Sequence, residues 1–283
     1  MRVAVTGANG FLGRHLTAAL AAGGDEVVGI SLERGALPAA IPFVAADIRD
    51  ADAVARAIDD AAPDAVVHLA ALSHVGESWR RIPDYYAVNI VGTANVARAA
   101  RGRHWLFSSS AEVYGAVPED EQPIAEDRPL APRSPYALTK AVAESIALDA
   151  GAVVVRSFNL VGQGQQTSFA LPSFAQQLAA IAKGGAPRVL RVGNLLARRD
   201  FVDVLDAVAA FRLLVAQGVA GTVYNLASGR APSIAEMLDR LRAVSGVAAS
   251  VEIEPERVRP LDVPMLCGDA RRLGELGWRP ERG

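Results

Sequence analysis

A tyrosine and a lysine four residues apart, Tyr136 and Lys140, are the residues of this chain best suited to chemistry. They belong to the segment Ser134-Pro135-Tyr136-Ala137-Leu138-Thr139-Lys140, which we expect to be helical, so both side chains lie on one face. An ammonium group beside a phenol lowers the pKa of the phenol from about 10, so Tyr136 is expected to exchange a proton near neutral pH. This spacing is frequent by chance, and its meaning depends on the rest of the chain.

The chain opens with a glycine-rich loop, Thr6-Gly7-Ala8-Asn9-Gly10-Phe11-Leu12-Gly13, between an apolar strand and a helix. In a dinucleotide-binding loop the first glycine permits a tight turn, the second lets the backbone approach a pyrophosphate, and the third allows close helix–strand packing. The helix N-terminus then faces the phosphate charge. Together, the loop and the tyrosine–lysine pair predict redox chemistry at a carbonyl or hydroxyl carbon. The predicted cofactor-binding residues of the loop are Gly7, Asn9, Gly10, Phe11, Leu12 and Gly13.

Strands and helices alternate along the first half of the chain, which predicts βαβ units and a Rossmann-like, doubly wound parallel sheet of the α/β class. We expect a dinucleotide-binding domain over residues 1–158. Residues 159–283 are expected to form mainly a smaller α/β lobe that binds the substrate, with segments such as 201–230 returning to the main sheet. The expected strands are 2–6, 26–31, 43–45, 65–69, 104–108, 153–157, 188–192 and 223–226.

Composition narrows the class of protein. The chain has 283 residues, of which 51% are hydrophobic and 21% charged, enough apolar material for a large core. The net charge of −2 provides no basic field for nucleic acid or an anionic membrane, and we find no run of about 18 apolar residues. Cys267 is the one cysteine, which fits a reducing cytoplasm, and the absence of cysteine or histidine pairs predicts no metal site.

The choice of nicotinamide cofactor depends on the end of the second strand. An NAD-preferring site places an acid there on the ribose 2′-hydroxyl, but Ser31 carries no charge. Ser31 and Arg34 would accept a 2′-phosphate, whereas Glu33 would oppose it, so the sequence favours NADPH over NADH. Asp47 and Ile48, after the third strand, are expected at the adenine. Leu69, Ala70 and Ala71, after the fourth, are expected along the ribose and phosphates.

The glycine loop, His68-Leu69-Ala70-Ala71, the segment Ser-Ser-Ser-Ala-Glu-Val-Tyr-Gly at 108–115 and the tyrosine–lysine pair together resemble the extended short-chain dehydrogenases/reductases. The resemblance covers nearly the whole chain. It implies that Ser110, Tyr136 and Lys140 form the active site, with Tyr136 as the acid–base group. Lys140 would hold the nicotinamide ribose and keep the pKa of Tyr136 low. Paired helices often form a dimer interface in this family, so a homodimer is expected through the helices that contain Tyr85 and Tyr136.

The residues after Ser110 bear on the type of reaction. The family's sugar-nucleotide 4,6-dehydratases carry an acid or serine followed by glutamate there, whereas this chain has Ala111-Glu112. Glu112 would have to serve as both groups, which disfavours dehydration. An NAD-dependent 4-epimerase or 4,6-dehydratase stays the alternative. A regulatory protein that only senses the cofactor would be expected to have lost one of the three active-site residues, and this chain keeps them.

The second half resembles enzymes that act on GDP-mannose derivatives. The segment 193–200, Gly-Asn-Leu-Leu-Ala-Arg-Arg-Asp, matches their G-N-L-x-x-x-R-D pattern, and 257–260 reads Arg-Val-Arg-Pro. The resemblance is greatest to reductases of GDP-6-deoxy-4-keto-D-mannose, which make GDP-D-rhamnose, and to their heptose counterparts. Gln163, in Gly-Gln-Gly-Gln, replaces a proline of these relatives. Arg199 and Arg259 would bind the diphosphate. The expected substrate-binding residues are Ser73, Glu112, Asn159, Asn194, Arg199 and Arg259.

Overall fold

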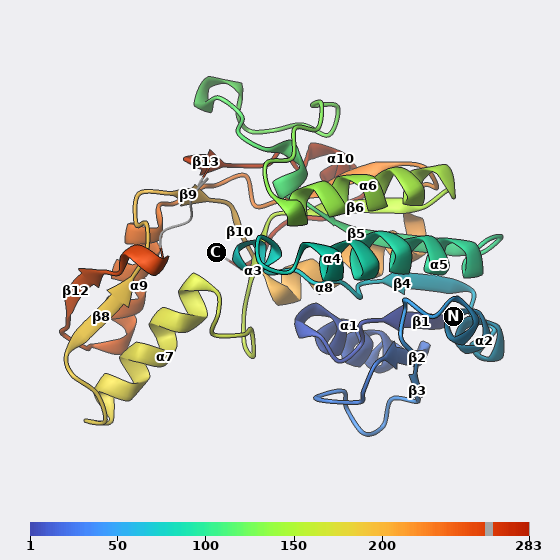
Figure 1. Cartoon of the computed structure of the whole chain (residues 1–283), viewed down its shortest axis with the longest axis horizontal. Coiled ribbons are helices and arrows are strands. Elements are labelled where there is room, and N and C mark those ends of the chain that lie inside the picture. The colour runs from blue at the N-terminus through green and yellow to red at the C-terminus, as the bar shows by residue number, and fades with distance from the viewer. Residues whose placement is uncertain (258–262, 283) are drawn as a thin grey trace.

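The computed structural model describes residues 1–257 and 263–282, and its centre is a seven-stranded parallel sheet (Figure 1). The strand order is β11-β6-β5-β4-β1-β2-β3. Successive strands are added on one side of β1 up to β3 and on its other side from β4 onward, so the strand order reverses between β1 and β4. This architecture confirms the predicted Rossmann-like class. The strands are β1 (Arg2–Thr6), β2 (Glu26–Ser31), β3 (Phe43–Ala45), β4 (Ala65–His68), β5 (His104–Ser110), β6 (Val153–Ser157) and β11 (Val223–Leu226).

Helices cover both faces of this sheet because its strands are apolar on both sides. One face packs against α1 (Phe11–Ala22) and α8 (Val204–Gln217), and its core includes Val5, Leu106 and Val155. The opposite face packs against α2 (Ala51–Ala61), α5 (Gly92–Ala99) and α6 (Pro135–Asp149), and its core includes Ala4, Phe107 and Val154. Within the described residues, no helix combines the length and apolar character needed to cross a bilayer.

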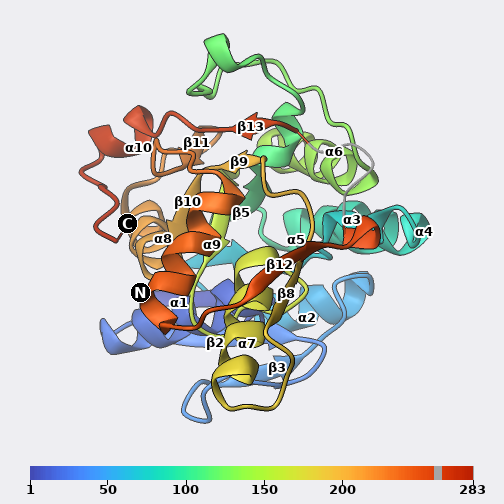
Figure 2. The same ribbon diagram turned by 90° about the vertical axis from the view of Figure 1, so that its left-hand side faces the viewer.

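A separate group of elements lies at one end of the molecule, on the left in Figure 1 and toward the viewer in Figure 2. It consists of α7 (Ala170–Ala182), β8 (Val189–Val192), α9 (Ile234–Ser245) and β12 (Ser250–Ile253). The first three share a core of their own, and β12 pairs with β8. We call these four elements the lobe. Ser233 and Glu236 form a capping box at the start of α9.

Short two-stranded sheets connect the lobe with the main sheet. One pairs β7 (Asn159–Val161) with β10 (Phe201–Asp203), and the other pairs β9 (Arg198–Arg199) with β13 (Met265–Leu266). Both pairs are parallel; β7 directly follows β6, and β10 leads directly into α8. The remaining elements are α3 (Val75–Ser78), α4 (Ile82–Tyr85), α10 (Arg271–Glu275), a π-helix (Tyr86–Val91) and short 3₁₀ turns at Ala111–Tyr114, Glu119–Glu121 and Pro255–Arg257.

The π-helix interrupts the helical segment that begins with α4 and ends with α5. Insertion of π turns widens the helix at Tyr86–Val91 and places the side chain of Asn89 toward the end of β4. Asn89 Oδ1 accepts a hydrogen bond from the backbone N–H of Leu72 at 2.9 Å, and its Nδ2 donates to the Leu72 carbonyl at 3.0 Å. The same Nδ2 donates to Thr139 Oγ1 on α6 at 3.0 Å. The widened turn thus connects the loop after β4 to the helix that carries Tyr136 and Lys140.

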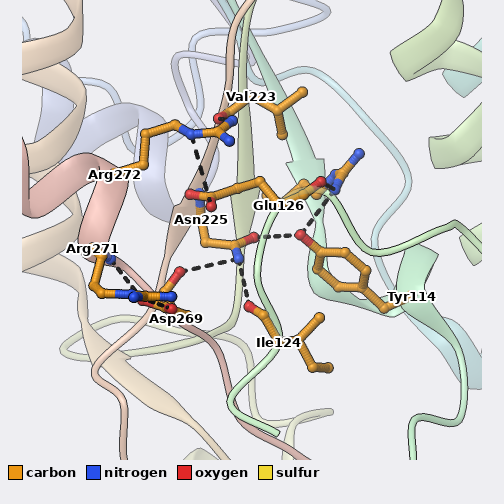
Figure 3. A network of polar contacts seen from close by, with 9 residues as sticks. Tyr114, Ile124, Glu126, Val223, Asn225, Asp269, Arg271 and Arg272 are labelled. Carbon is orange, nitrogen blue, oxygen red and sulfur yellow. Dashed lines mark hydrogen bonds and ion pairs between the residues drawn. The ribbon is translucent and has the colours of Figure 1, made fainter. Parts of the chain in front are cut away.

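A buried amide, Asn225 of β11, holds the long segment beyond β5 against the sheet (Figure 3). Asn225 Oδ1 accepts from the Tyr114 hydroxyl at 2.7 Å, and its Nδ2 donates to the carbonyls of Ile124 and Asp269 at 2.8 and 3.1 Å. The backbone N–H of Asn225 donates to Glu126 Oε1 at 2.9 Å. These contacts fix the edge strand to the polypeptide that follows the serine run.

Candidate active site

A cleft of about 950 Å³ lies at the carboxyl ends of the central strands and extends to the lobe. Ligands of open α/β sheets bind at this edge, where the strand order reverses. Most of the residues predicted for the site line this cleft: Gly7, Asn9, Gly10, Phe11, Leu12, Gly13, Leu69, Ala71, Ser73, Ser110, Glu112, Tyr136, Lys140, Asn159, Asn194 and Arg199. The other predicted residues that the structure describes, Ser31, Arg34, Asp47, Ile48 and Ala70, do not line it. Arg259 lies outside the described residues.

The backbone geometry of the glycine loop fits a dinucleotide. Gly7 has φ +69°, and a Cβ there would come within 2.6 Å of the Ala70 backbone nitrogen. A Cβ on Gly13 would come within 2.2 Å of the Gly7 carbonyl oxygen, so the start of α1 sits directly on the turn. At Gly10 the only neighbour within 4 Å of such a Cβ is the Gly7 carbonyl, at 3.1 Å, which leaves the cleft side of the loop open to a phosphate group. The requirement for glycine therefore comes from close packing at two positions and from access at the third.

Among the residues expected at the adenine end, Ser31 and Arg34 contact nearby backbone groups, and Asp47 contacts a charged side chain. Ser31 Oγ accepts from the Asn9 N–H at 3.4 Å, and Asn9 Nδ2 donates to the Glu33 carbonyl at 2.9 Å. Arg34 Nη1 donates to the carbonyls of Pro38 and Ile41, and its guanidinium lies 5.2 Å from the centre of the Phe43 ring. The Asp47 carboxylate forms an ion pair with Arg49, which lowers the pKa of Asp47.

Ser110 and Tyr136 are brought together by β5 and α6. Ser110 ends β5, next to Ser157 of β6 in the parallel register. The Ser134 hydroxyl caps α6 by accepting from the Ala137 N–H at 3.1 Å, and Pro135 occupies the first turn, where its missing N–H has no cost. The helix therefore starts abruptly at the edge of the sheet, where the Tyr136 side chain forms a hydrogen bond with Ser110.

The electrostatics of this pair differ from the prediction. Burial raises the pKa of Tyr136 to about 12, and its hydrogen bond with Ser110 lowers that pKa only in part. Burial also lowers the pKa of Lys140 to about 7, and its Nζ lies 4.4 Å from the centre of the Phe107 ring. We expected Lys140 to lower the pKa of Tyr136 toward neutral pH. This expectation is wrong for the ligand-free protein, because burial of the phenol, which disfavours its charged form, has the largest effect on its pKa. Tyr136 is a protonated phenol at neutral pH.

A neutral histidine supports the strand behind the glycine loop. The Nδ1 of His68 lies 2.7 Å from Thr6 Oγ1, and its Nε2 lies 3.1 Å from Thr93 Oγ1. Complete burial, with a smaller contribution from the charge of Lys140, lowers the pKa of His68 to about 3. The imidazole is thus an uncharged structural link between β1, β4 and α5.

On the lobe side of the cleft, two residues of the predicted substrate set are tied to nearby backbone. Arg199 is buried, and its Nη1 donates to the carbonyls of Arg198 and Val263 at 2.8 and 2.7 Å. Asn194 Oδ1 accepts from the Leu196 N–H at 3.0 Å. These contacts orient both side chains at the cleft wall.

Asp200, the last residue of the 193–200 motif, has a structural position that the motif does not reveal. Its buried carboxylate accepts from the Ser228 N–H and hydroxyl, both at 2.7 Å, and from the N–H groups of Gly229 and Gly268 at 2.9 and 3.2 Å. Asp200 therefore links three chain segments that pass between the main sheet and the lobe: its own, the one at 228–229 and the one at Gly268.

Two further features of the site were missed by sequence reasoning. Arg14 of α1 donates to the carbonyls of Gln163 and Gly164, so the loop that departs from the G-P-G-Q pattern is held against the start of α1. Glu144, one turn after Lys140 on α6, forms an ion pair with Arg156 at 2.6 Å. The i,i+4 spacing of Lys140 and Glu144 is a signal that could have found the second feature. Among the described residues, no group of three or more His, Cys, Asp or Glu side chains could hold a metal ion.

Comparison with known proteins gives matches over the whole length of the chain. Residues 3–227 match the model of the "NAD dependent epimerase/dehydratase family". A GDP-6-deoxy-D-mannose reductase of Pseudomonas aeruginosa is 35% identical over 99% of this chain and 92% of its own length.

Two solved structures are closely similar to this one. The UDP-glucose 4-epimerase of Thermus thermophilus, in complex with NAD, has a TM-score of 0.89 and 31% identity, covering 100% of this chain and 95% of the other. The RMD protein of Pseudomonas aeruginosa, complexed with NADPH, has a TM-score of 0.88 and 33% identity over the same shares. The NAD and NADPH in these structures agree with the geometry of the glycine loop, which fits a dinucleotide.

Proposed function

The chain belongs to the NAD-dependent epimerase/dehydratase family, as an NAD(P)-dependent oxidoreductase that acts on a nucleotide sugar, and from this premise we propose that it reduces a C4 keto group. The proposed substrate is a GDP-linked 6-deoxy-4-keto sugar, either the hexose that gives GDP-D-rhamnose or the heptose counterpart. The observation that carries the proposal is the protonated Tyr136, hydrogen-bonded to Ser110 at the cleft. Reduction of a ketone needs a proton donor at the carbonyl oxygen, and a phenol with a raised pKa is in the donating form.

In the proposed mechanism, Ser110 and Tyr136 both hydrogen-bond the C4 oxygen and polarise the carbonyl. The nicotinamide, when bound, supplies a hydride to C4. Tyr136 donates its proton to the C4 oxygen, so that ketone, hydride and proton together give the alcohol. Lys140, buried beside the tyrosine, stabilises the tyrosinate that is left and holds the nicotinamide ribose.

The residues after Ser110 support reduction over dehydration. Ala111 is buried and offers no acid to protonate a leaving hydroxyl, while Glu112 is the one carboxylate adjacent to Ser110 in the 3₁₀ turn. A 4,6-dehydratase needs an acid and a base at these positions. The 193–200 motif and the similarity to the Pseudomonas reductase support a GDP-linked substrate. The proposed substrate-binding residues of the described chain are Ser73, Glu112, Asn159, Asn194 and Arg199, and Arg259 completes the set.

An NAD-dependent 4-epimerase is the second candidate, because the similarity to the Thermus epimerase structure is equally extensive. The two candidates differ in how they treat the cofactor. An epimerase returns its hydride to the same substrate and keeps NAD bound, whereas a reductase consumes one NADPH for each product. Ser31, uncharged at the end of β2, supports the proposed preference for NADPH.

We also propose a homodimer. Exposed apolar side chains gather on neighbouring elements of one face: Ile82 of α4, Tyr86 and Val91 of the π-helix, and Leu138 and Val142 of α6. Leu138 and Val142 are one helical turn apart, so they form a stripe. The packing of α4 and the π-helix against α6 makes this surface continuous and suited to a second copy of the chain.

The test incubates the purified protein with NADPH and enzymatically prepared GDP-4-keto-6-deoxymannose, followed by NMR identification of the sugar. We expect stoichiometric NADPH oxidation and a 4-hydroxy product. Tyr136→Phe should lower kcat/KM by about 10²–10⁴-fold, whereas Tyr86→Phe, at an exposed tyrosine of the neighbouring helix, should not. Turnover without added NADPH, by protein that retains NAD through purification, would establish the epimerase instead. A substrate that stays unreduced, with the unaltered protein and Tyr136→Phe behaving identically, would refute the proposed reduction.

A further inference from the structure

An ion pair of Glu144 and Arg156 lies buried directly behind the proposed catalytic residues. Arg156 donates through Nη2 to Glu144 Oε1 at 2.6 Å and through Nε to both carboxylate oxygens at 3.1 and 3.2 Å. The two side chains are only 2% and 6% exposed. A buried ion pair is weak evidence for stability by itself, because its desolvation cost offsets its attraction. Its position therefore calls for an explanation other than stability.

The pair connects every element that presents a proposed catalytic group. Glu144 lies on α6, four residues after Lys140 on the same buried face of the helix. Its Oε2 accepts from the hydroxyl of Ser109, the neighbour of Ser110 on β5, at 2.6 Å. Arg156 lies on β6 and also donates to the Tyr114 hydroxyl at 2.8 Å, in the turn that follows Ser110. Movement of Glu144 would thus disturb both β5 and α6 at the site.

We propose that Glu144 is a positioning residue, whose carboxylate, held by Arg156 and Ser109, stabilises the charged form of Lys140 and fixes α6 against the serine strand. This inference rests on the function proposed for Lys140. It does not require that the substrate be known, because the state of Lys140 can be measured directly.

The groups around Lys140 determine the sign of the effect. The Phe107 ring and the neutral imidazole of His68 face it from β5 and β4, and Tyr136 precedes it on α6. Burial lowers the pKa of Lys140, and the charge of Glu144 raises it. Glu144 itself faces Ser109 and Arg156. Removal of its negative charge should therefore lower the pKa of Lys140 further, so that the lysine loses its proton at a lower pH.

The chain allows a direct titration because Lys140 and Lys183 are its only lysines. With lysine labelled in ¹³C at the ε position, NMR should show two signals, and that of Lys183 serves as the internal reference. In the unaltered protein we expect Lys140 to titrate with a pKa of about 7. In Glu144→Gln its midpoint should fall by about one pH unit or more. Because this variant leaves the charge of Arg156 buried and unpaired, it could fail to fold.

The double variant Glu144→Gln/Arg156→Met removes both charges and keeps the volume, a replacement that buried ion pairs tolerate. It should fold, and its Lys140 should still titrate lower than in the unaltered protein, by less than in Glu144→Gln because the opposing charge of Arg156 is removed as well. The alkaline limb of kcat/KM for reduction should move by the same amount. Asp206→Asn is the matched control. It removes another buried carboxylate, paired with Arg282 on the opposite face of the sheet, and should lower stability without moving the Lys140 titration.

An unchanged Lys140 titration in the folded double variant would overturn the inference and leave Glu144 as a structural partner of Arg156. An equal shift in Asp206→Asn would also overturn it, because the shift would then follow from lost stability. If Tyr136→Phe is fully active but Lys140 shifts as expected, the proposed reaction fails while the effect of Glu144 on Lys140 stands.

Discussion

The turn of the glycine loop makes a quantitative prediction that separates two costs of replacing a glycine. Gly7 and Gly24 both have a positive φ, +69° and +89°. A Cβ at Gly7 would come within 2.6 and 2.8 Å of Ala70 backbone N and Cα and 2.9 Å of the Leu69 carbonyl carbon, whereas a Cβ at Gly24 has nothing within 4 Å. Gly24→Ala therefore measures backbone strain alone, and Gly7→Ala measures strain together with the clash.

The magnitudes follow from these contacts. The left-handed conformation costs an alanine about 1–2 kcal/mol, and its lower entropy in the unfolded chain returns about 0.4–1 kcal/mol. Both contributions are common to the two variants and cancel in their difference. The clash involves backbone that cannot rotate away, and forcing such an atom into packed structure costs about 1–3 kcal/mol. Gly7→Ala should thus lose about 1–3 kcal/mol more of the free energy of unfolding than Gly24→Ala.

Urea denaturation of both variants at one pH, followed by far-UV circular dichroism, measures this difference. NADPH binding, followed by nucleotide fluorescence, adds a functional measurement. Because the clash separates the loop from the end of β4, Gly7→Ala should bind NADPH at least about tenfold more weakly, a loss of about 1.4 kcal/mol, while Gly24→Ala should bind normally. Equal stability losses, or equal NADPH affinities, would show that the close approach of Gly7 to Ala70 is not what requires glycine.

Three other predictions concern charge, reactivity and assembly. Lys140→Met should raise the free energy of unfolding of the ligand-free protein at pH 6. The folded state lowers the pKa of Lys140 from 10.5 to about 7 and so disfavours its protonated form. The gain in stability should therefore disappear as the pH rises toward 10.5. The same variant should lose about 100-fold or more in kcat/KM, and a loss of stability at pH 6 would contradict the reasoning. Cys267 is buried, and burial raises the pKa of its thiol to about 11, so iodoacetamide at pH 8 should modify it only after denaturation, as counted by mass spectrometry. Leu138→Glu/Val142→Glu should convert a dimer to a monomer in sedimentation velocity, whereas Val244→Glu, at an exposed valine of the lobe, should not change the mass.

The fold could be predicted largely because a buried parallel sheet requires a simple hydrophobic pattern in the sequence. Strands such as Val153–Ser157 are apolar on both faces, and the segments between them have helical length, so element type and order follow from the hydrophobic pattern. The short pairs β7–β10 and β9–β13 leave no such pattern. Strands of two or three residues have no measurable periodicity, and their pairing depends on contacts that are distant in sequence.

The site shows the same limit. Tyr136 and Lys140 could be proposed from their types and spacing, and Ser110 from the resemblance to a known family. The pKa of Tyr136 could not, since it depends on how deeply the phenol is buried. The contacts of Arg199 and Asp200 could not be predicted from the sequence. The motif indicates that these residues matter, but only the folded chain shows their contacts with backbone groups of residues 198, 228–229, 263 and 268 and with the Ser228 hydroxyl.

The route of the chain between the main sheet and the lobe has a consequence for engineering and for evolution. The polypeptide leaves β6 for β7, returns through β10 into α8, and leaves again after β11 toward α9, while β13 comes back to pair with β9. The lobe is therefore not a contiguous cassette, and a chimaera that exchanged it between relatives would need joints at each of these crossings. Every joint would have to preserve the hydrogen bonds of Asp200. We expect new sugar specificities in this architecture to arise by substitutions and loop insertions within the lobe, rather than by recombination of a whole module.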